Sequence, residues 1–129
     1  TRAVNSAEIK PEEVDYINMH GTASALGDET ELNAVEMSGL KPQLINSTKS
    51  LIGHGLTAAG VVETIATIIQ MEEGFVHESR NLTDPMSSEL TFPIGESKQL
   101  DIRYALSNGF GFGGINTSIL LENRSLTKK

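Results

Sequence analysis

The chain has 129 residues, which suits about one globular domain, and a formal net charge of −7 at pH 7. Ten Lys and Arg against seventeen Asp and Glu argue against a surface for nucleic acid or for anionic membranes. The chain contains no cysteine, which excludes a disulfide framework, a thiolate zinc site and a cysteine nucleophile within these residues.

The first part of the chain alternates predicted helices and strands. After a short amphipathic opening, residues 14–19 predict a strand that ends at a glycine-containing loop. Residues 27–40 have helical spacing, with an apolar stripe through Leu32 and Val35. Residues 44–46 predict a short buried strand.

A long helix is predicted from His54 to about Glu73. The segment is rich in Ala, Val and Ile, and a helix that is apolar on most sides should be sandwiched between layers. Its mostly apolar run, 61–71, is interrupted by two polar residues and is too short to span a membrane. A connection over residues 74–96 follows, and residues 101–123 predict two antiparallel strands joined by a glycine-rich turn. This order of elements predicts an α/β layered domain.

Three loops that follow predicted strands carry the residues suited to chemistry. Sites in α/β sheets gather beyond the carboxyl ends of strands, so we expect His20, the pair Lys49 and His54, and the turn at 108–114 to converge. Each signal is weak alone, because a single histidine, a loop cation and turn phenylalanines all have ordinary structural explanations. A cation at a helix start opposes the helix dipole, which favours a functional role for Lys49. The glycine-rich turn precedes a strand, not a helix, and this excludes a dinucleotide site.

Together, three motifs are specific: HGTASALGDETE, STKSLIGHGLTAAGVVE and NGFGFGGIN. In this order and spacing they resemble the carboxyl-terminal half of β-ketoacyl-acyl-carrier-protein synthases, the condensing enzymes of fatty-acid and polyketide synthesis. The resemblance implies a thiolase-type layered α-β-α-β-α fold, with a mixed sheet and a buried helix. It also implies that residues 1–129 form a carboxyl-terminal ketosynthase subdomain, incomplete at its amino-terminal end, and that the nucleophilic cysteine lies on a missing amino-terminal half.

The resemblance assigns roles residue by residue. His20 and His54 match the two active-site histidines, Lys49 matches the lysine before the second histidine, and Glu63 matches its acidic partner. Phe112 matches the residue that gates the acyl pocket and lends its backbone N–H to the oxyanion hole. The implied substrate-binding positions are Thr22, Ser24, Phe110 and Gly111. The serine stands where many relatives have threonine, and it keeps a hydroxyl for the phosphopantetheine arm of the carrier.

The residues of this set suit decarboxylative Claisen condensation. Two neutral imidazoles, each donating one N–H, hold the oxygen of the enolate that forms when carbon dioxide leaves a malonyl unit. A preorganised donor of this kind contributes about 3–4 kcal/mol. Lys49 with Glu63 would fix the surroundings of His54. Spacing alone does not pair Lys49 with Glu63. The nine residues from His54 to Glu63 make about two and a half helical turns, so Glu63 lies off the face of His54 and reaches Lys49 only if the loop folds back.

Alternatives from other classes stay open. Without a cysteine on the missing half, the protein would be a malonyl decarboxylase or a chain-length-type partner subunit. A catalytically silent scaffold and a free-standing module that binds an acyl carrier are further alternatives. Joint retention of the residues with assigned catalytic roles disfavours a silent scaffold, and the apolar long helix disfavours a free-standing module.

Further expectations concern cofactors, partners and location. We expect no cofactor and no metal, because the substrate is carried on the phosphopantetheine arm of an acyl carrier protein. The expected partners are the missing amino-terminal half, the acyl carrier protein and a second subunit in a homodimer or heterodimer, with no nucleic acid. No secretory signal opens the chain, so a cytoplasmic location is expected.

Overall fold

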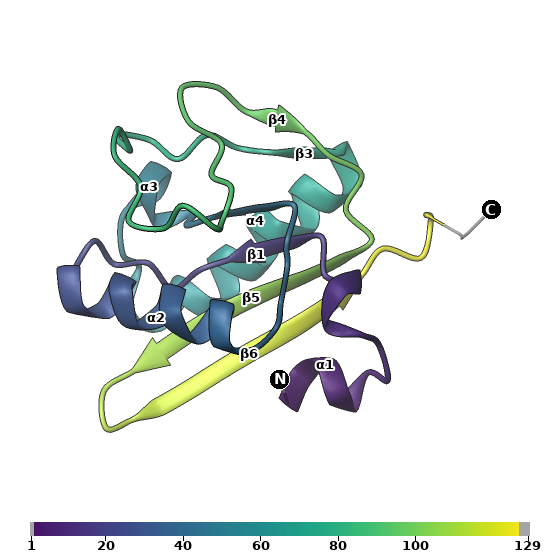
Figure 1. The fold of residues 1–129 in the computed structure, drawn as a ribbon, viewed down its shortest axis with the longest axis horizontal. Helices are drawn as coiled ribbons and strands as arrows, with labels where there is room; N and C mark the ends of the chain where they lie inside the picture. Colours follow the sequence, from purple (N-terminus) through teal and green to yellow (C-terminus); the bar gives the residue numbers. More distant parts are fainter. Residues whose placement is uncertain (1, 127–129) are drawn as a thin grey trace.

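A computed structural model describes residues 2–126 and shows a four-stranded mixed sheet with helices on both faces (Figure 1). The strands are β1 (Tyr16–Asn18), β2 (Leu44–Asn46), β5 (Tyr104–Gly111) and β6 (Ile115–Glu122), in the order β2-β1-β5-β6. β1 pairs in parallel with β2 and β5, whereas β5 and β6 form an antiparallel hairpin. The loops that follow β1 and β2 therefore leave the sheet at the same edge.

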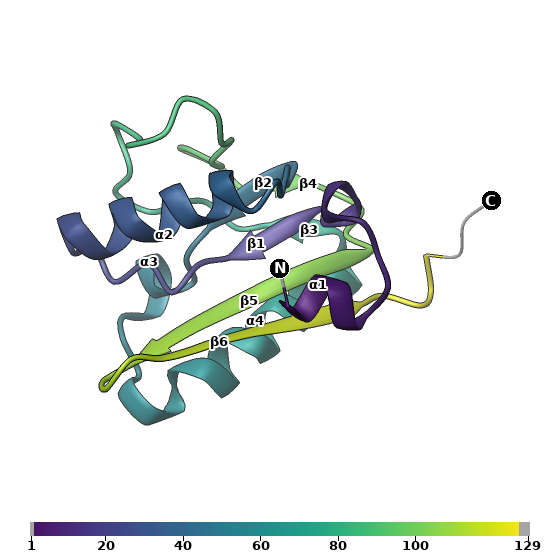
Figure 2. The same cartoon turned by 60° about the horizontal axis from the view of Figure 1, so that its bottom comes forward.

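Two layers of helices enclose this sheet (Figure 2). The helices α1 (Arg2–Ser6) and α2 (Ala25–Met37) lie on one face, and α4 (Ala59–Glu73) lies on the other. The remaining elements are short: η1 (Pro11–Glu13), α3 (Lys49–Ile52), η2 (Leu56–Ala58), β3 (Phe75–Val76) and β4 (Lys98–Gln99). β3 and β4 form a separate two-stranded antiparallel sheet.

The two faces of the sheet build two apolar clusters. Successive residues of a strand point to opposite faces, and all three residues of β1 are buried. Ile17 packs with Leu32 of α2, whereas its neighbour Tyr16 packs with Met71 of α4. The sheet therefore lies between α2 and α4, and the loops that follow β1 and β2 leave it between these two helices.

The structure confirms most predicted elements, and its main correction is to the start of the long helix. The predicted strand at 44–46 is β2, and the predicted helix at 27–40 is α2 with slightly earlier ends. The long helix does not begin at His54, because α4 begins at Ala59 after the single turn of η2. The glycines flanking the histidine interrupt the helix, and Gly53 has a φ of +76°. His54 therefore lies on a loop.

The polarity of α4 is opposite to that of an ordinary surface helix. The side chains that it buries include the polar residues Glu63, Thr67 and Gln70. Most of its large apolar residues face outward, and Val61 is 66% and Ile65 51% exposed. The predicted cover on most sides is thus absent within residues 2–126, because the four-stranded sheet packs against the inner side of α4 and no second layer reaches its outer side.

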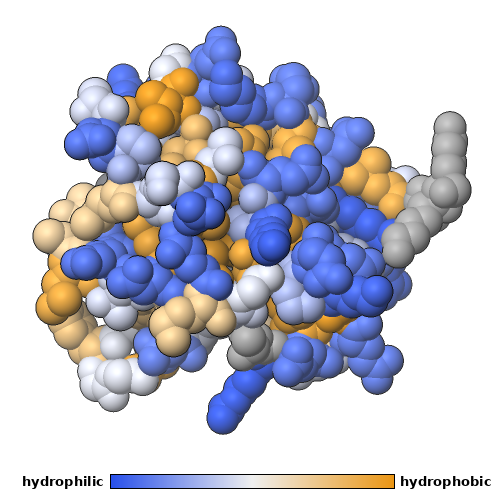
Figure 3. Space-filling model, viewed as in Figure 1, coloured by the Kyte–Doolittle hydropathy of each residue, from blue (hydrophilic) through white to orange (hydrophobic). Residues whose placement is uncertain are grey.

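The opposite side of the molecule is different in character. Figure 3 shows the face that carries α2 in front, and hydrophilic residues predominate over its centre and right side. Within the described part of the chain, no helix is both long enough and apolar enough to cross a membrane.

Candidate active site

The loop that carries His20 is held from two sides. The carboxylate of Glu31 on α2 accepts the backbone N–H of His20 at 2.9 Å and that of Gly21 at 3.0 Å. The hydroxyl of Ser47, which follows β2, donates to the carbonyl of Gly21 at 3.1 Å. A Cβ at position 21 would lie 2.7 Å from the Cβ of Ser47, and the φ of Gly21 is +38°, so this close approach requires glycine.

Glu31 is the functional residue that the sequence interpretation missed. Its side chain also accepts a hydrogen bond from Asn108 Nδ2 at 3.1 Å, and only 3% of the residue is exposed. Burial raises the pKa of the Glu31 carboxyl, and the hydrogen bonds from the two backbone N–H groups act in the opposite direction. One signal was available: Glu31 lies four positions before Val35, on the apolar face of the predicted helix.

Lys49 and Glu63 form a buried ion pair. Lys49 is the first residue of α3 and Glu63 lies in the first half of α4, yet their side chains meet and are only 4% and 2% exposed. The loop between α3 and α4 folds back, as the pairing required. Each charge is compensated by the other in a region from which water is largely excluded.

Hydrogen bonds assign the proton positions of the two histidines. The ammonium of Lys49 lies 3.5 Å from Nδ1 of His20, and an ammonium only donates, so this nitrogen accepts and the ring proton is on Nε2. The backbone N–H of Leu56 donates to Nδ1 of His54 at 3.0 Å, which again leaves the proton on Nε2. Each neutral ring therefore keeps one N–H for another acceptor.

The two imidazoles are neighbours. Their ring centroids are 5.4 Å apart and the ring planes are nearly perpendicular, at 86°. Burial lowers the pKa of His20, and the nearby Lys49 and His54 lower it further, which favours the neutral donor. The arrangement supplies two N–H donors without a formal positive charge on either ring.

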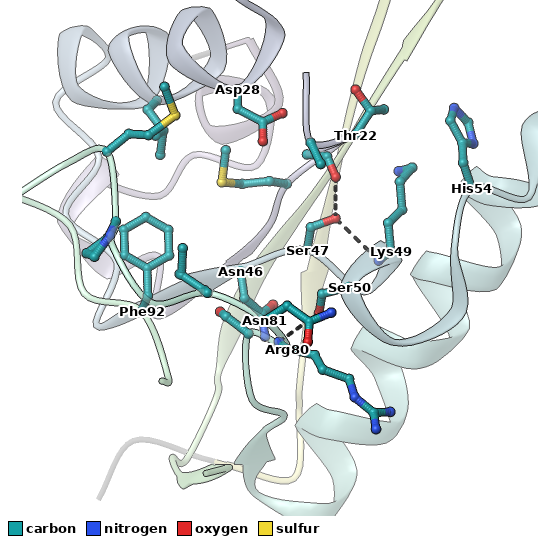
Figure 4. Close-up of a pocket in the computed structure, with 18 of the residues that line it drawn as sticks. Thr22, Asp28, Asn46, Ser47, Lys49, Ser50, His54, Arg80, Asn81 and Phe92 are labelled. Atoms are coloured by element: carbon teal, nitrogen blue, oxygen red, sulfur yellow. Dashed lines mark hydrogen bonds between the residues drawn. The ribbon is translucent and has the colours of Figure 1, made fainter. Parts of the chain in front are cut away.

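A cavity of about 470 Å³ adjoins these groups. In Figure 4 the Lys49 side chain extends toward the region between Thr22 and His54, while Phe92 lies at the far end of the cavity. The hydroxyls of Thr22 and Ser24 lie 3.2 Å apart at the loop before α2. In the described part of the chain, no group of three or more His, Asp or Glu side chains is arranged to hold a metal ion.

The two phenylalanines of the glycine-rich segment lie in different surroundings. Phe110, on β5, has its ring centroid 5.2 Å from that of His20. Gly111 ends β5, and Phe112 lies in the following turn with its side chain fully exposed. Phe112 is therefore not a core aromatic, and its role as a gate stays a prediction. The structure thus brings His20, His54, Lys49, Glu63 and Phe110 together, with Thr22 beside them.

A substitution at Gly113, in the turn that contains Phe112, distinguishes a gating role of this turn from a purely structural one. Its φ is +82° and a Cβ there would meet no atom within 4 Å, so Gly113→Val adds backbone strain of about 1–2 kcal/mol without a clash. If the turn is the gate that the resemblance implies, we expect acyl loading of the complete protein to fall, while the melting temperature falls only as far as this strain requires. Gly95→Val is the matched control, because Gly95 has a φ of +77° and equally open surroundings. Proportionate losses of melting temperature and loading would instead identify a structural turn.

Residues 1–83 match the family described as the beta-ketoacyl synthase, C-terminal domain. The chain belongs to this family. It is 44% identical over 122 residues to the polyketide biosynthesis malonyl-ACP decarboxylase PksF of Bacillus subtilis (strain 168). It is 47% identical over 123 residues to the chloroplastic 3-oxoacyl-[acyl-carrier-protein] synthase II of Arabidopsis thaliana. These matches cover 95% and 92% of this ketosynthase chain, but only 29% and 23% of the two relatives.

Solved structures show the same fold. A beta-ketoacyl synthase from Burkholderia phymatum STM815 superposes with a TM-score of 0.87 at 36% identity, over 93% of this chain and 30% of that one. The structure of a type II polyketide acyl-carrier protein in complex with its ketosynthase gives a TM-score of 0.84 at 31% identity, over 94% and 31%. The sheet and its two helical layers therefore form part of the thiolase-like ketosynthase fold.

Proposed function

We propose that the chain is the carboxyl-terminal part of a β-ketoacyl-acyl-carrier-protein synthase, an acyltransferase that condenses an acyl thioester with a malonyl unit in fatty-acid or polyketide synthesis. The observation that carries this proposal is the pair of neighbouring imidazoles. Nδ1 of His54 accepts from the Leu56 N–H, and Nδ1 of His20 faces the Lys49 ammonium. The Nε2–H groups of both rings are therefore available. Two such donors suit one oxygen on which negative charge develops.

The reaction that this pair supports begins with the malonyl thioester. The bond between the α-carbon and the carboxylate breaks, carbon dioxide leaves, and the electron pair gives an enolate whose oxygen accepts from His20 and His54. The α-carbon then attacks the carbonyl of an acyl group held as a thioester, and the thiolate leaves. The cysteine that holds this acyl group is proposed to lie on the amino-terminal half, because the present chain has no cysteine.

A second candidate shares the first step. The 44% identity to a relative named as a malonyl-ACP decarboxylase favours an enzyme that releases carbon dioxide and then protonates the carbanion. A chain-length-type subunit is the third candidate, and one solved relative is described as a ketosynthase/chain length factor. Condensation requires a nucleophile in the amino-terminal half, whereas decarboxylation alone does not.

The test of the proposed function is an assay of the complete synthase with malonyl-loaded acyl carrier protein. We expect release of carbon dioxide, and formation of a β-ketoacyl product when an acyl donor is also supplied. Carbon dioxide release with only an acetyl product identifies the decarboxylase. An enzyme that folds and binds the carrier but releases no carbon dioxide would contradict both candidates.

The exposed apolar residues on the outer side of α4 support the proposal that the amino-terminal half of such a synthase packs there. These residues are Val61, Val62, Ile65, Ile68 and Ile69. A contiguous apolar surface of this kind is characteristic of an interface. The chain spans only about a quarter to a third of the relatives named above, so the remainder of such a synthase is the occupant that we propose.

The isolated chain should associate through this surface. We expect it to aggregate or sediment as oligomers, and Val61→Gln with Ile65→Gln to reduce the association. Met37→Gln is the matched control, because Met37 on α2 is 89% exposed but does not belong to the α4 surface. A monodisperse monomer that melts cooperatively in calorimetry would contradict this expectation.

The other partners follow from the proposed reaction. In this proposal the acyl carrier protein delivers the malonyl unit on its phosphopantetheine arm. Thr22, which lines the cavity, and the neighbouring hydroxyl of Ser24 would contact that arm. A homodimer or heterodimer of the complete enzyme, a cytoplasmic location and catalysis without a resident cofactor complete the proposal.

A further inference from the structure

Thr48, the residue before Lys49, is bound on one side by a buried amide. Its backbone N–H and its hydroxyl both donate to Oδ1 of Asn18, at 3.0 Å and 2.7 Å. Nδ2 of Asn18 donates in turn to the hydroxyl of Ser107 on β5 at 3.3 Å. Thr48 is 3% exposed and Asn18 is fully buried. One amide therefore ties the start of α3 to the two central strands of the sheet.

A third histidine encloses Thr48 from the other side. Nε2 of His77 lies 3.4 Å from the Thr48 hydroxyl. The carbonyl of Glu78 lies 2.8 Å from Nδ1, and the side-chain amide of Asn46 lies 3.2 Å from the same nitrogen. The backbone of His77 is itself fixed, because its N–H donates to Gln70 Oε1 at 2.9 Å and its carbonyl accepts from Asn46 Nδ2 at 2.7 Å. The ring is therefore held against Thr48 by α4 and β2.

The short helix α3 needs such anchoring. It has four residues, and a single helical turn is unstable on its own because nucleation is costly. Lys49, its first residue, must nevertheless place one ammonium against both Glu63 and Nδ1 of His20. The Lys49 side chain is long and flexible, so its backbone has to be fixed by other residues.

We propose that Thr48 is a positioning residue, whose paired hydrogen bonds to Asn18 hold Lys49 on Glu63 and His20 and so keep His20 in its donor form. This inference rests on the proposed function. Thr48 touches neither the substrate nor the reacting atoms and acts through Lys49. A displacement of about 1 Å in such a position can lower a rate by about 10²-fold.

The readout that separates positioning from stability is the pH profile. The charged and titratable groups around His20 are Lys49, His54, Glu31 and, through its pairing with Lys49, Glu63. The positive charge of Lys49 contributes to the lowered pKa of His20. Displacing that charge lets the His20 pKa rise, so the acidic limb of the decarboxylation profile moves to higher pH. A loss of folded protein would lower the rate without moving this limb.

The experiment compares variants of the complete synthase. Thr48→Val keeps the shape of the side chain and removes the hydroxyl, and we expect kcat for malonyl decarboxylation to fall about tenfold with KM unchanged and the acidic limb shifted upward. Thr48→Ser restores the hydroxyl and should restore both. Thr67→Val is the matched control, because Thr67 is fully buried and its hydroxyl donates within α4 only, to the Glu63 carbonyl at 2.8 Å.

The outcomes against the inference are distinct from those against the proposed function. A Thr48→Val enzyme with the wild-type profile, or with a loss matching that of Thr67→Val, would overturn the role of Thr48 while wild-type decarboxylation stands. If Thr48→Val does not fold, Thr48→Ala, which adds no volume, takes its place. If neither folds, Thr48 is a residue of fold stability and the inference fails. An inactive but folded wild-type enzyme would instead overturn the proposed function.

Discussion

His20→Ala and His54→Ala should each slow the release of carbon dioxide from malonyl-loaded carrier protein by about 10²–10³-fold in the complete synthase. Each substitution removes one of two preorganised N–H donors from the developing enolate oxygen. Acyl loading of the nucleophile does not generate this enolate and should be affected less, so it serves as the internal control. Unchanged carbon dioxide release in both variants would remove the two histidines from the proposed mechanism.

The pH dependence of the same step follows from His20. Protonation of its Nδ1 would place a positive ring against the Lys49 ammonium, so the ring should act in its neutral form. Because burial and the neighbouring Lys49 and His54 lower the pKa of His20, the neutral form persists below the ordinary histidine value of about 6.5. Decarboxylation should therefore decline only at pH values under that point. A decline centred above it would contradict the assignment.

Breaking the pair of Lys49 and Glu63 should have the largest effect on stability. Lys49→Met or Glu63→Leu leaves one buried charge without its partner, which is expected to cost about 3–5 kcal/mol in the free energy of unfolding. The double variant should be less destabilised than the sum of the two single variants, since it leaves no unpaired charge. Chemical denaturation of the complete synthase measures all three.

An exposed ion pair provides the control for this experiment. Lys98 and Glu96 lie 2.6 Å apart, but their side chains are 44% and 73% exposed. Water solvates either charge when the other is removed, so Lys98→Met should leave the free energy of unfolding nearly unchanged in the same denaturation experiment. Equal effects at the buried and the exposed pair would show that burial does not determine the cost.

The sequence predicted β1, β2, β5, β6 and α2 because their signals are local, whereas the two-residue strands β3 and β4 were not predicted. Residues 44–46 and the terminal hairpin are apolar runs bounded by turn residues, and both form as expected. The start of α4 was misplaced because composition gives no separate weight to the two glycines around His54. The residue at 53 has a positive φ that an uninterrupted helix does not allow.

The place of the site could be predicted from the loops that follow the strands, but the pairing of Lys49 with Glu63 only through the family resemblance. Lys49 and Glu63 are fourteen positions apart on different helices, and no periodicity joins them. Glu31 lies on the apolar face of the predicted helix, but it was missed because the backbone N–H groups that its carboxylate binds leave no mark in the sequence. The exposed position of Phe112 depends on the conformation of a turn rich in glycine, where the backbone has many accessible angles.

The polar inner face of α4 sets the rotation of that helix about its own axis. Apolar contacts tolerate a small roll, but hydrogen bonds and ion pairs are directional. A roll by one residue position, about 100°, would move Glu63 off Lys49 and Gln70 off Tyr16 at the same time. The outer apolar residues of α4 are thereby presented in one fixed orientation, so any layer that packs on them is aligned with the two histidines.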